Sequence, residues 1–162
     1  MRSADLAHFH GEKLEKSRHR DKSDFVEAEC SDILLSVKRI SEILPESESA
    51  YLSSNFVIKG AIERNLQLIS DRQTNILYAL YSGRLRISGD YDTLLKYSDV
   101  FGKKLLEKTK LRRSLRNMLV HNYVDSILDK DVFIHASSLE DVIEFVEKAR
   151  EIVASKEKSK GQ

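Results

Sequence analysis

Residues that interrupt helices are scarce in this sequence. Its 162 residues include one Pro and six Gly, and these are the two residue types that a helix interior tolerates least. Apolar residues instead recur every three or four positions, which is the spacing that places their side chains on one face of a helix. No useful length of the sequence alternates apolar and polar residues, as a half-buried strand does. The sequence therefore predicts an all-α fold.

The apolar spacing also divides the chain into segments. We predict helices over 24–44, 51–82, 100–121 and 139–154, a short fifth helix over 90–99, and less regular backbone over 122–137. Pro45 ends the first helix, because proline cannot continue the helical hydrogen bonds. Short links between helices imply an antiparallel bundle of four to five helices. We expect residues 24–154 to form this bundle, with residues 1–23 as an N-terminal extension and residues 155–162 as a charged tail.

Composition excludes several classes of protein. No apolar run approaches the roughly 20 residues that a membrane span needs, and the N-terminus lacks the apolar core of a signal peptide. We therefore expect a soluble, cytoplasmic protein. The single Cys30 excludes an internal disulfide and a zinc site built from cysteines. His8 and His10 have no acidic or cysteine companions in a clear ligand pattern, so we expect no metal site.

Charge is distributed unevenly, although the formal net charge is only +1. Between Lys103 and Arg116 the chain carries seven Lys or Arg and one Glu, a local balance of 7 − 1 = +6. Such a basic stretch can attract phosphate groups. In the predicted helix over 51–82, four polar residues also share one face; they are Arg64, Gln67, Asp71 and Asn75. This face has two open interpretations, an ordinary solvated surface or the lining of a cleft.

The most informative segment is Arg116–Tyr123, which reads Arg-Asn-Met-Leu-Val-His-Asn-Tyr. A guanidinium offers a planar fork to phosphate oxygens, and an imidazole titrates near neutral pH and can act as acid or base. Arg116 and His121 supply one of each. Simpler interpretations exist: Arg116 as one charge of a basic face, His121 as a helix C-terminal residue favoured by the dipole, and Tyr123 as a packed aromatic residue.

Helix geometry limits how these side chains can meet. A spacing of five residues separates two side chains by roughly 140° on an ideal helix, so Arg116 and His121 do not point to one spot. Asn117 and His121 share a face, and so do Arg116 and Tyr123 if the helix lasts that far. Convergence of the arginine and the histidine therefore requires a helix end near His121 or a second subunit.

The segment resembles the Arg-x4-His signature of HEPN domains, in the Arg-Asn-x-Leu-Val-His-x-Tyr form that is typical of HepT-like toxins. The stretch Ala61–Gln67 is similar to the second-helix pattern of that subfamily. The order of the elements agrees as well, because the motif lies late on the penultimate long helix. The resemblance covers roughly residues 24–154 and implies a HEPN-like bundle.

The resemblance also implies an activity and an assembly. HEPN proteins of this type are endoribonucleases that need neither metal nor cofactor, with the arginine and histidine, here Arg116 and His121, as catalytic residues. They form homodimers whose paired motifs make a composite cleft for RNA. We expect Asn117 to hold the helix end or orient His121, and Asp71 and Asn75 to support the site from the polar face.

The motif tyrosine has its own implied role. In HepT-like toxin–antitoxin pairs, a small nucleotidyltransferase antitoxin is understood to transfer AMP to this tyrosine and silence the toxin. The resemblance therefore implies that Tyr123 is the acceptor for AMPylation. The alternative is a non-catalytic helical partner or substrate-binding subunit of a nucleotidyltransferase. The motif retains its Arg, Asn, His and Tyr, which favours the enzyme.

Overall fold

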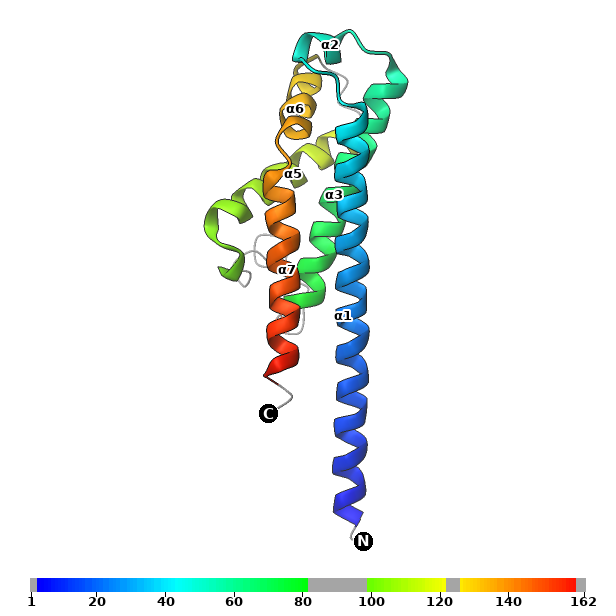
Figure 1. Cartoon of the computed structure of the whole chain (residues 1–162), viewed down its shortest axis with the longest axis vertical. Helices are drawn as coiled ribbons and strands as arrows, with labels where there is room; N and C mark the ends of the chain where they lie inside the picture. The colour runs from blue at the N-terminus through cyan, green and yellow to red at the C-terminus, as the bar shows by residue number, and fades with distance from the viewer. Residues whose placement is uncertain (1–2, 82–98, 122–125, 160–162) are drawn as a thin grey trace.

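The computed structural model describes residues 3–81, 99–121 and 126–159. In these ranges the chain forms six α-helices and one 3₁₀ helix, with no strand (Figure 1). The elements are α1 (Ser3–Ile43), α2 (Glu48–Leu52), α3 (Phe56–Tyr81), η2 (Asp99–Phe101), α5 (Lys103–Val120), α6 (Ser126–Ser137) and α7 (Glu140–Lys158). The prediction of an all-α fold is confirmed.

Side-chain caps divide the predicted helix over 51–82 into two. The hydroxyl oxygen of Ser47 accepts a hydrogen bond from the backbone N–H of Ala50 and begins the short α2. Asn55 Oδ1 accepts hydrogen bonds from the N–H groups of Val57 and Ile58, both at 3.1 Å, and begins α3. Such caps satisfy amide groups that have no partner inside the helix. The apolar spacing alone did not reveal this break.

The prediction of less regular backbone over 122–137 is wrong for most of that range, because α6 occupies Ser126–Ser137. Its apolar positions, Leu128, Val132 and Ala136, recur every four residues and pack onto the core. The acidic and basic residues between them concealed this spacing. Most of the short helix predicted over 90–99 lies outside the described residues.

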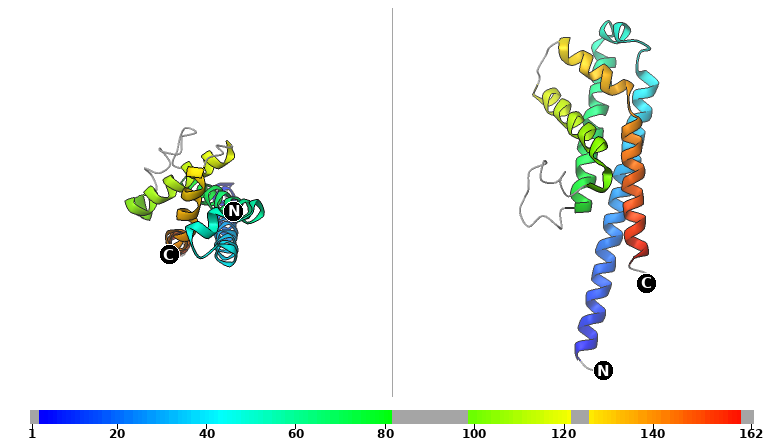
Figure 2. Two further views of the ribbon diagram at one scale, coloured as in Figure 1. Left: turned by 90° about the horizontal axis from the view of Figure 1, so that it is seen from above. Right: turned by 90° about the vertical axis from the view of Figure 1, so that its left-hand side faces the viewer.

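The longest helices form the body of the molecule. Helices α1 and α3 pack together along much of their length, and α7 lies beside α1 (Figures 1 and 2). Their facing apolar side chains are fully buried, including Ile33, Ile40, Ile69, Ile76 and Val142. Helix α5 crosses α3 on the other side, and this crossing places the candidate motif.

The predicted domain limits do not coincide with breaks in the helices. Helix α1 begins at Ser3 and is continuous through the predicted boundary at 23/24, and its N-terminal part extends beyond the other helices (Figure 1). Helix α7 continues to Lys158, past the predicted start of the tail. The division into extension, bundle and tail stays a prediction. Among the described helices, none has the length and apolar character needed to cross a membrane.

The start of α5 is held by a turn and an aromatic contact. Gly102 adopts φ +83°, a left-handed conformation that glycine takes without strain. Just before it, the ring of Phe101 stacks on Phe145 of α7, with ring centroids 4.7 Å apart. The turn and the stacked rings fix where α5 leaves the core, so its far end projects beside the beginning of α6 (Figure 2).

Candidate functional site

The candidate site lies at the C-terminal end of α5. The helix ends at Val120, and His121 is its C-cap, with φ −86° and ψ 11°. The backbone N–H of His121 donates to the carbonyl oxygen of Asn117 at 3.2 Å, and the histidine side chain is exposed. Of the two conditions under which Arg116 and His121 could converge, the helix end near His121 is therefore present. Between these two described side chains the structure contains no hydrogen bond.

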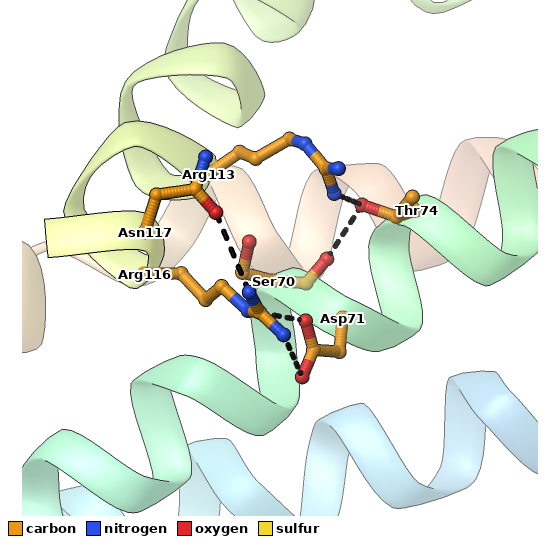
Figure 3. A network of polar contacts seen from close by, with 6 residues as sticks. All are labelled: Ser70, Asp71, Thr74, Arg113, Arg116 and Asn117. Atoms are coloured by element: carbon orange, nitrogen blue, oxygen red, sulfur yellow. Dashed lines mark hydrogen bonds and ion pairs between the residues drawn. The ribbon is translucent and has the colours of Figure 1, made fainter. Parts of the chain in front are cut away.

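Arg116 is oriented by a carboxylate from α3. Its Nε donates to Asp71 Oδ1 at 2.7 Å, and its Nη2 donates to Asp71 Oδ2 at 3.5 Å (Figure 3). Arg116 Nη1 also donates to Asn117 Oδ1 at 3.4 Å. These contacts use three of the five N–H donors that a guanidinium carries. The side chains of Arg116 and Asp71 are 31% and 37% exposed, so the guanidinium is held in place and stays accessible to an anion.

A second polar contact aligns α5 on α3 one turn earlier. Arg113 Nη1 donates to Thr74 Oγ1 at 3.0 Å, and the Thr74 hydroxyl donates to the carbonyl oxygen of Ser70 at 3.0 Å (Figure 3). The sequence interpretation missed Arg113 and Thr74 as partners. Arg113 stands three residues before Arg116, so both arginines can reach the same side of α3, and this spacing was the available signal.

Asn75 does not join the motif. Its amide Nδ2 donates to Glu29 Oε2 of α1 at 3.2 Å, and the neighbouring Arg72 pairs with Glu29 and with Asp32 at 3.1 Å and 2.9 Å. Four residues along a helix advance by about 400°, which is about 40° beyond a full turn. The polar face of α3 therefore winds from α5 at Asp71 toward α1 at Asn75. The structure thus places Asp71 and Asn75 against different helices, and the supporting role expected of both stays a prediction.

A comparison with family models matches residues 33–149 to the ribonuclease HepT-like family. The chain belongs to this HepT-like family. The matched residues include Asp71, Arg116 and His121, so the α3–α5 contact lies inside the region that matches the family model. The resemblance inferred from the sequence motif is confirmed.

Two solved structures have the same fold as this HepT-like chain. One is a tri-AMPylated HEPN toxin of Shewanella oneidensis in complex with its MNT antitoxin, with a TM-score of 0.64 and 23% identity over 77% of this chain and 96% of the toxin. The other is a toxin–antitoxin structure with AMP-PNP, with a TM-score of 0.63 and 22% identity over 78% of this chain and 98% of the other. A comparison with curated proteins gave no match. The HEPN-like bundle is confirmed.

Tyr123, the predicted acceptor of AMP, lies outside the described residues. The last described residue before it is His121, the C-cap of α5. Within the described ranges of this HepT-like protein, no group of three His, Cys, Asp or Glu side chains is placed to hold a metal ion.

The basic stretch of this HepT-like protein is not one continuous surface. Lys103, Lys104 and Lys110 are exposed, whereas Arg113 and Arg116 are half-buried and face α3. Arg112 differs from both groups, because its side chain is only 2% exposed and pairs with Asp141 of α7. The local charge of +6 therefore overstates what a phosphate backbone can reach, because one of the seven cations is neutralised inside the protein.

Proposed function

We propose that the chain is the toxin of a toxin–antitoxin pair, an endoribonuclease that cleaves RNA without a metal ion and acts in the cytoplasm. The observation that carries the proposal is the exposed end of α5, where Asp71 holds the Arg116 guanidinium beside the helix terminus that bears His121. Membership of the HepT-like ribonuclease family supports the same activity.

The two side chains supply the groups that RNA cleavage requires. An imidazole takes the proton of the ribose 2′-OH as its oxygen attacks phosphorus, and an imidazolium gives a proton to the 5′ oxygen as the P–O5′ bond breaks. The products are a 2′,3′-cyclic phosphate and a 5′-hydroxyl. Arg116 stabilises the additional negative charge on the phosphoryl oxygens during the attack. Asp71 positions Arg116 and itself transfers no proton.

A homodimer would bring two copies of His121 to one substrate, so that one imidazole acts as base and the other as acid. The outer face of α5 suits such pairing. Leu111 and Met118 lie on this face, seven residues apart, and share it with Ser114 and His121 through steps of three and four. Leu111 is 60% exposed and Met118 is 37% exposed. Covering these apolar side chains with the same face of a second copy would remove them from water beside the motif.

Silencing by a nucleotidyltransferase antitoxin follows from the same site. The two similar solved structures are toxin–antitoxin assemblies, and the toxin in one of them is AMPylated. In this chain we assign the acceptor role to Tyr123, two residues after His121 in the sequence. An attached AMP adds bulk and negative charge at the position that RNA phosphate would occupy, and both oppose RNA binding.

The second candidate function is a helical subunit that binds a nucleotidyltransferase without cleaving RNA. The same similarity to antitoxin-bound chains supports it, because binding a partner does not require a functional motif. Cleavage therefore decides between the two functions.

The deciding experiment measures RNA cleavage by purified wild-type protein with unmodified Tyr123, in the presence of EDTA. We expect the wild type to cleave and Arg116→Ala and His121→Ala to lose about 10²–10⁴-fold in rate. Glu151→Gln, a change at an exposed residue of α7, is the control and should retain activity. A wild type that leaves RNA intact, while still binding a nucleotidyltransferase, would favour the second function.

A further inference from the structure

A buried ion pair lies one turn before the motif on α5. Arg112 Nη1 donates to Asp141 Oδ2 at 2.8 Å, and Arg112 Nη2 donates to Asp141 Oδ1 at 3.2 Å. Asp141 belongs to the first turn of α7 and is 4% exposed. The two parallel hydrogen bonds fix both the separation and the relative direction of the two side chains. The pair therefore joins the motif helix to the C-terminal helix through the interior of the protein.

Net stability does not explain why this pair is present. Removing two charges from water is costly, and replacing a buried ion pair with apolar residues of similar size is often neutral or stabilising. The Nε of Arg112 is also buried without a hydrogen-bond partner among the described residues, which adds to the cost. Such a pair can instead specify a direction, because its two parallel hydrogen bonds are both satisfied in one relative arrangement of the helices.

Three helices meet at Arg112. Helix α5 packs mainly on α3, and it contacts α6 and α7 near the junction between them (Figures 1 and 2). His135 belongs to the last turn of α6. Its burial lowers the pKa of the imidazole, and the positive charge of nearby Arg112 lowers it further. A neutral His135 adds no second cation beside Arg112. The local electrostatics thus favour one arrangement, with Arg112 directed at Asp141.

Arg112 and Arg116 share the inner face of α5, since they are four residues apart. If α5 changed direction at Arg112, the C-terminal end of the helix would be displaced as well, and Arg116 and His121 lie at that end. The contact between Arg116 and Asp71 is partly exposed and cannot by itself prevent such a shift, because surface ion pairs are weak. The buried pair lies nearer the core and acts on the whole last turn.

We infer that Arg112 and Asp141 are positioning residues, whose buried pair sets the direction of α5 and so places Arg116 and His121 for RNA cleavage. This inference rests on the proposed function. Neither residue contacts RNA, and both act through the helix that they orient.

The test replaces both partners with apolar residues of similar size, in the double variant Arg112→Met/Asp141→Leu. The full-length variant should fold, with an unfolding temperature close to or above that of the wild type. Its kcat for RNA cleavage should fall by about ten- to a hundred-fold, because small misplacements of catalytic groups have effects of this size. Its KM should stay within about two-fold of the wild type, because the phosphate-binding groups are still present.

A control variant removes a different ion pair, one that joins two helices other than α5. Arg150 of α7 binds Glu27 of α1, with Nε donating to Oε2 at 2.9 Å. The double variant Arg150→Gln/Glu27→Gln should retain the wild-type kcat and KM. A loss of kcat in the control as large as in the test variant would overturn the inference, because any disturbance of α7 would then have the same effect.

Two further outcomes bear on the inference. A stable Arg112→Met/Asp141→Leu variant with the wild-type kcat would overturn it. If this variant does not fold, Arg112→Lys replaces it, since lysine keeps the charge but not the planar fork. Arg112→Lys should fold and lose kcat with little change in KM. Failure of both variants to fold would assign the pair to folding and overturn a positioning role.

Amide hydrogen exchange separates this inference from the proposed function. If wild-type protein leaves all RNA intact, the proposed function fails, and exchange still reports how firmly the end of α5 is held against the rest of the protein. In the double variant, the last turn of α5, Arg116–Val120, should exchange faster, while α1 and α3 keep their protection. Unchanged exchange over Arg116–Val120 would overturn the inference whether or not RNA is cleaved.

Discussion

Two arginines one turn apart on α5 hold carboxylates in opposite surroundings. Arg112 binds Asp141 in the interior, where both side chains are less than 5% exposed. Arg116 binds Asp71 at the surface, where about a third of each side chain is exposed. The shortest contacts are nearly equal, 2.8 Å and 2.7 Å. The two pairs therefore differ in their access to water far more than in their geometry.

Access to water decides what each pair can do. Opening the buried pair leaves a charge without compensation in the interior, so the pair stays closed and fixes the helix. Opening the surface pair is inexpensive, because water or another anion can replace the carboxylate. Under the proposed function, a phosphate binds the N–H donors of Arg116 that Asp71 does not use, and Asp71 keeps the guanidinium oriented. One helix then combines a buried contact that sets alignment with an exposed contact that an anion can reach.

The largest expected effect comes from breaking only one side of the buried pair. Asp141→Ala leaves Arg112 charged and unpaired, so we expect the free energy of unfolding to fall by about 3–5 kcal/mol. Urea denaturation followed by circular dichroism measures this change. Asp71→Ala, its counterpart at the surface, should cost no more than about 1 kcal/mol. Equal losses in the two variants would contradict the contrast between the pairs.

The surface pair should show the reverse pattern, with a small effect on stability and a larger one on activity. Asp71→Ala leaves the Arg116 guanidinium free to rotate, so RNA cleavage should slow by about ten- to a hundred-fold. Steady-state cleavage assays measure the change. Asp32→Ala is the matched control, because it removes a similar surface pair, with Arg72, on the α1 side of α3. An equal loss of cleavage in both variants would remove the positioning role from Asp71.

The sequence predicted those features of the candidate site that depend on neighbouring residues. The motif singled out Arg116 and His121 as candidates, and the polar face of α3 contained Asp71; their roles stay predictions. The distinction between Asp71 and Asn75 was not predictable, because it depends on which helix packs against each side of α3. The α1 contact of Asn75 joins residues 46 positions apart, and no local pattern encodes such a pairing.

The burial of Arg112 shows the same limit more sharply. Residues 105, 109, 112, 116 and 119 follow steps of three and four, so Arg112 occupies a core position in the helical pattern. This arginine was nevertheless counted only among the cations that could attract phosphate, because arginine is rarely buried without a partner. That partner, Asp141, lies 29 residues later on another helix. Only the fold supplied the carboxylate that makes the burial of Arg112 possible.

The smallest expected effect is a pH dependence of stability that arises at His135, beside the buried pair. Burial, and then the charge of Arg112, lower the pKa of His135 below its usual 6.5, while Asp131 and Asp141 act in the opposite direction. The unfolded chain therefore binds a proton on His135 more readily than the folded chain does. By linkage, the contribution of His135 to the free energy of unfolding falls as the pH drops below about 6.5. The loss is complete only once the pH is below the folded pKa.

His135→Gln removes this proton-binding site, so the variant should lose less stability on acidification than the wild type. We expect the difference between their unfolding temperatures to change by about 1–3 °C between pH 7.5 and pH 5.5. Differential scanning calorimetry measures it, and the other titrating groups cancel in the difference. Parallel curves for the two proteins would mean that folding does not lower the pKa of His135. A difference that grows toward acid would instead show that burial, and then the charge of Arg112, disfavour the proton on His135 in the folded protein.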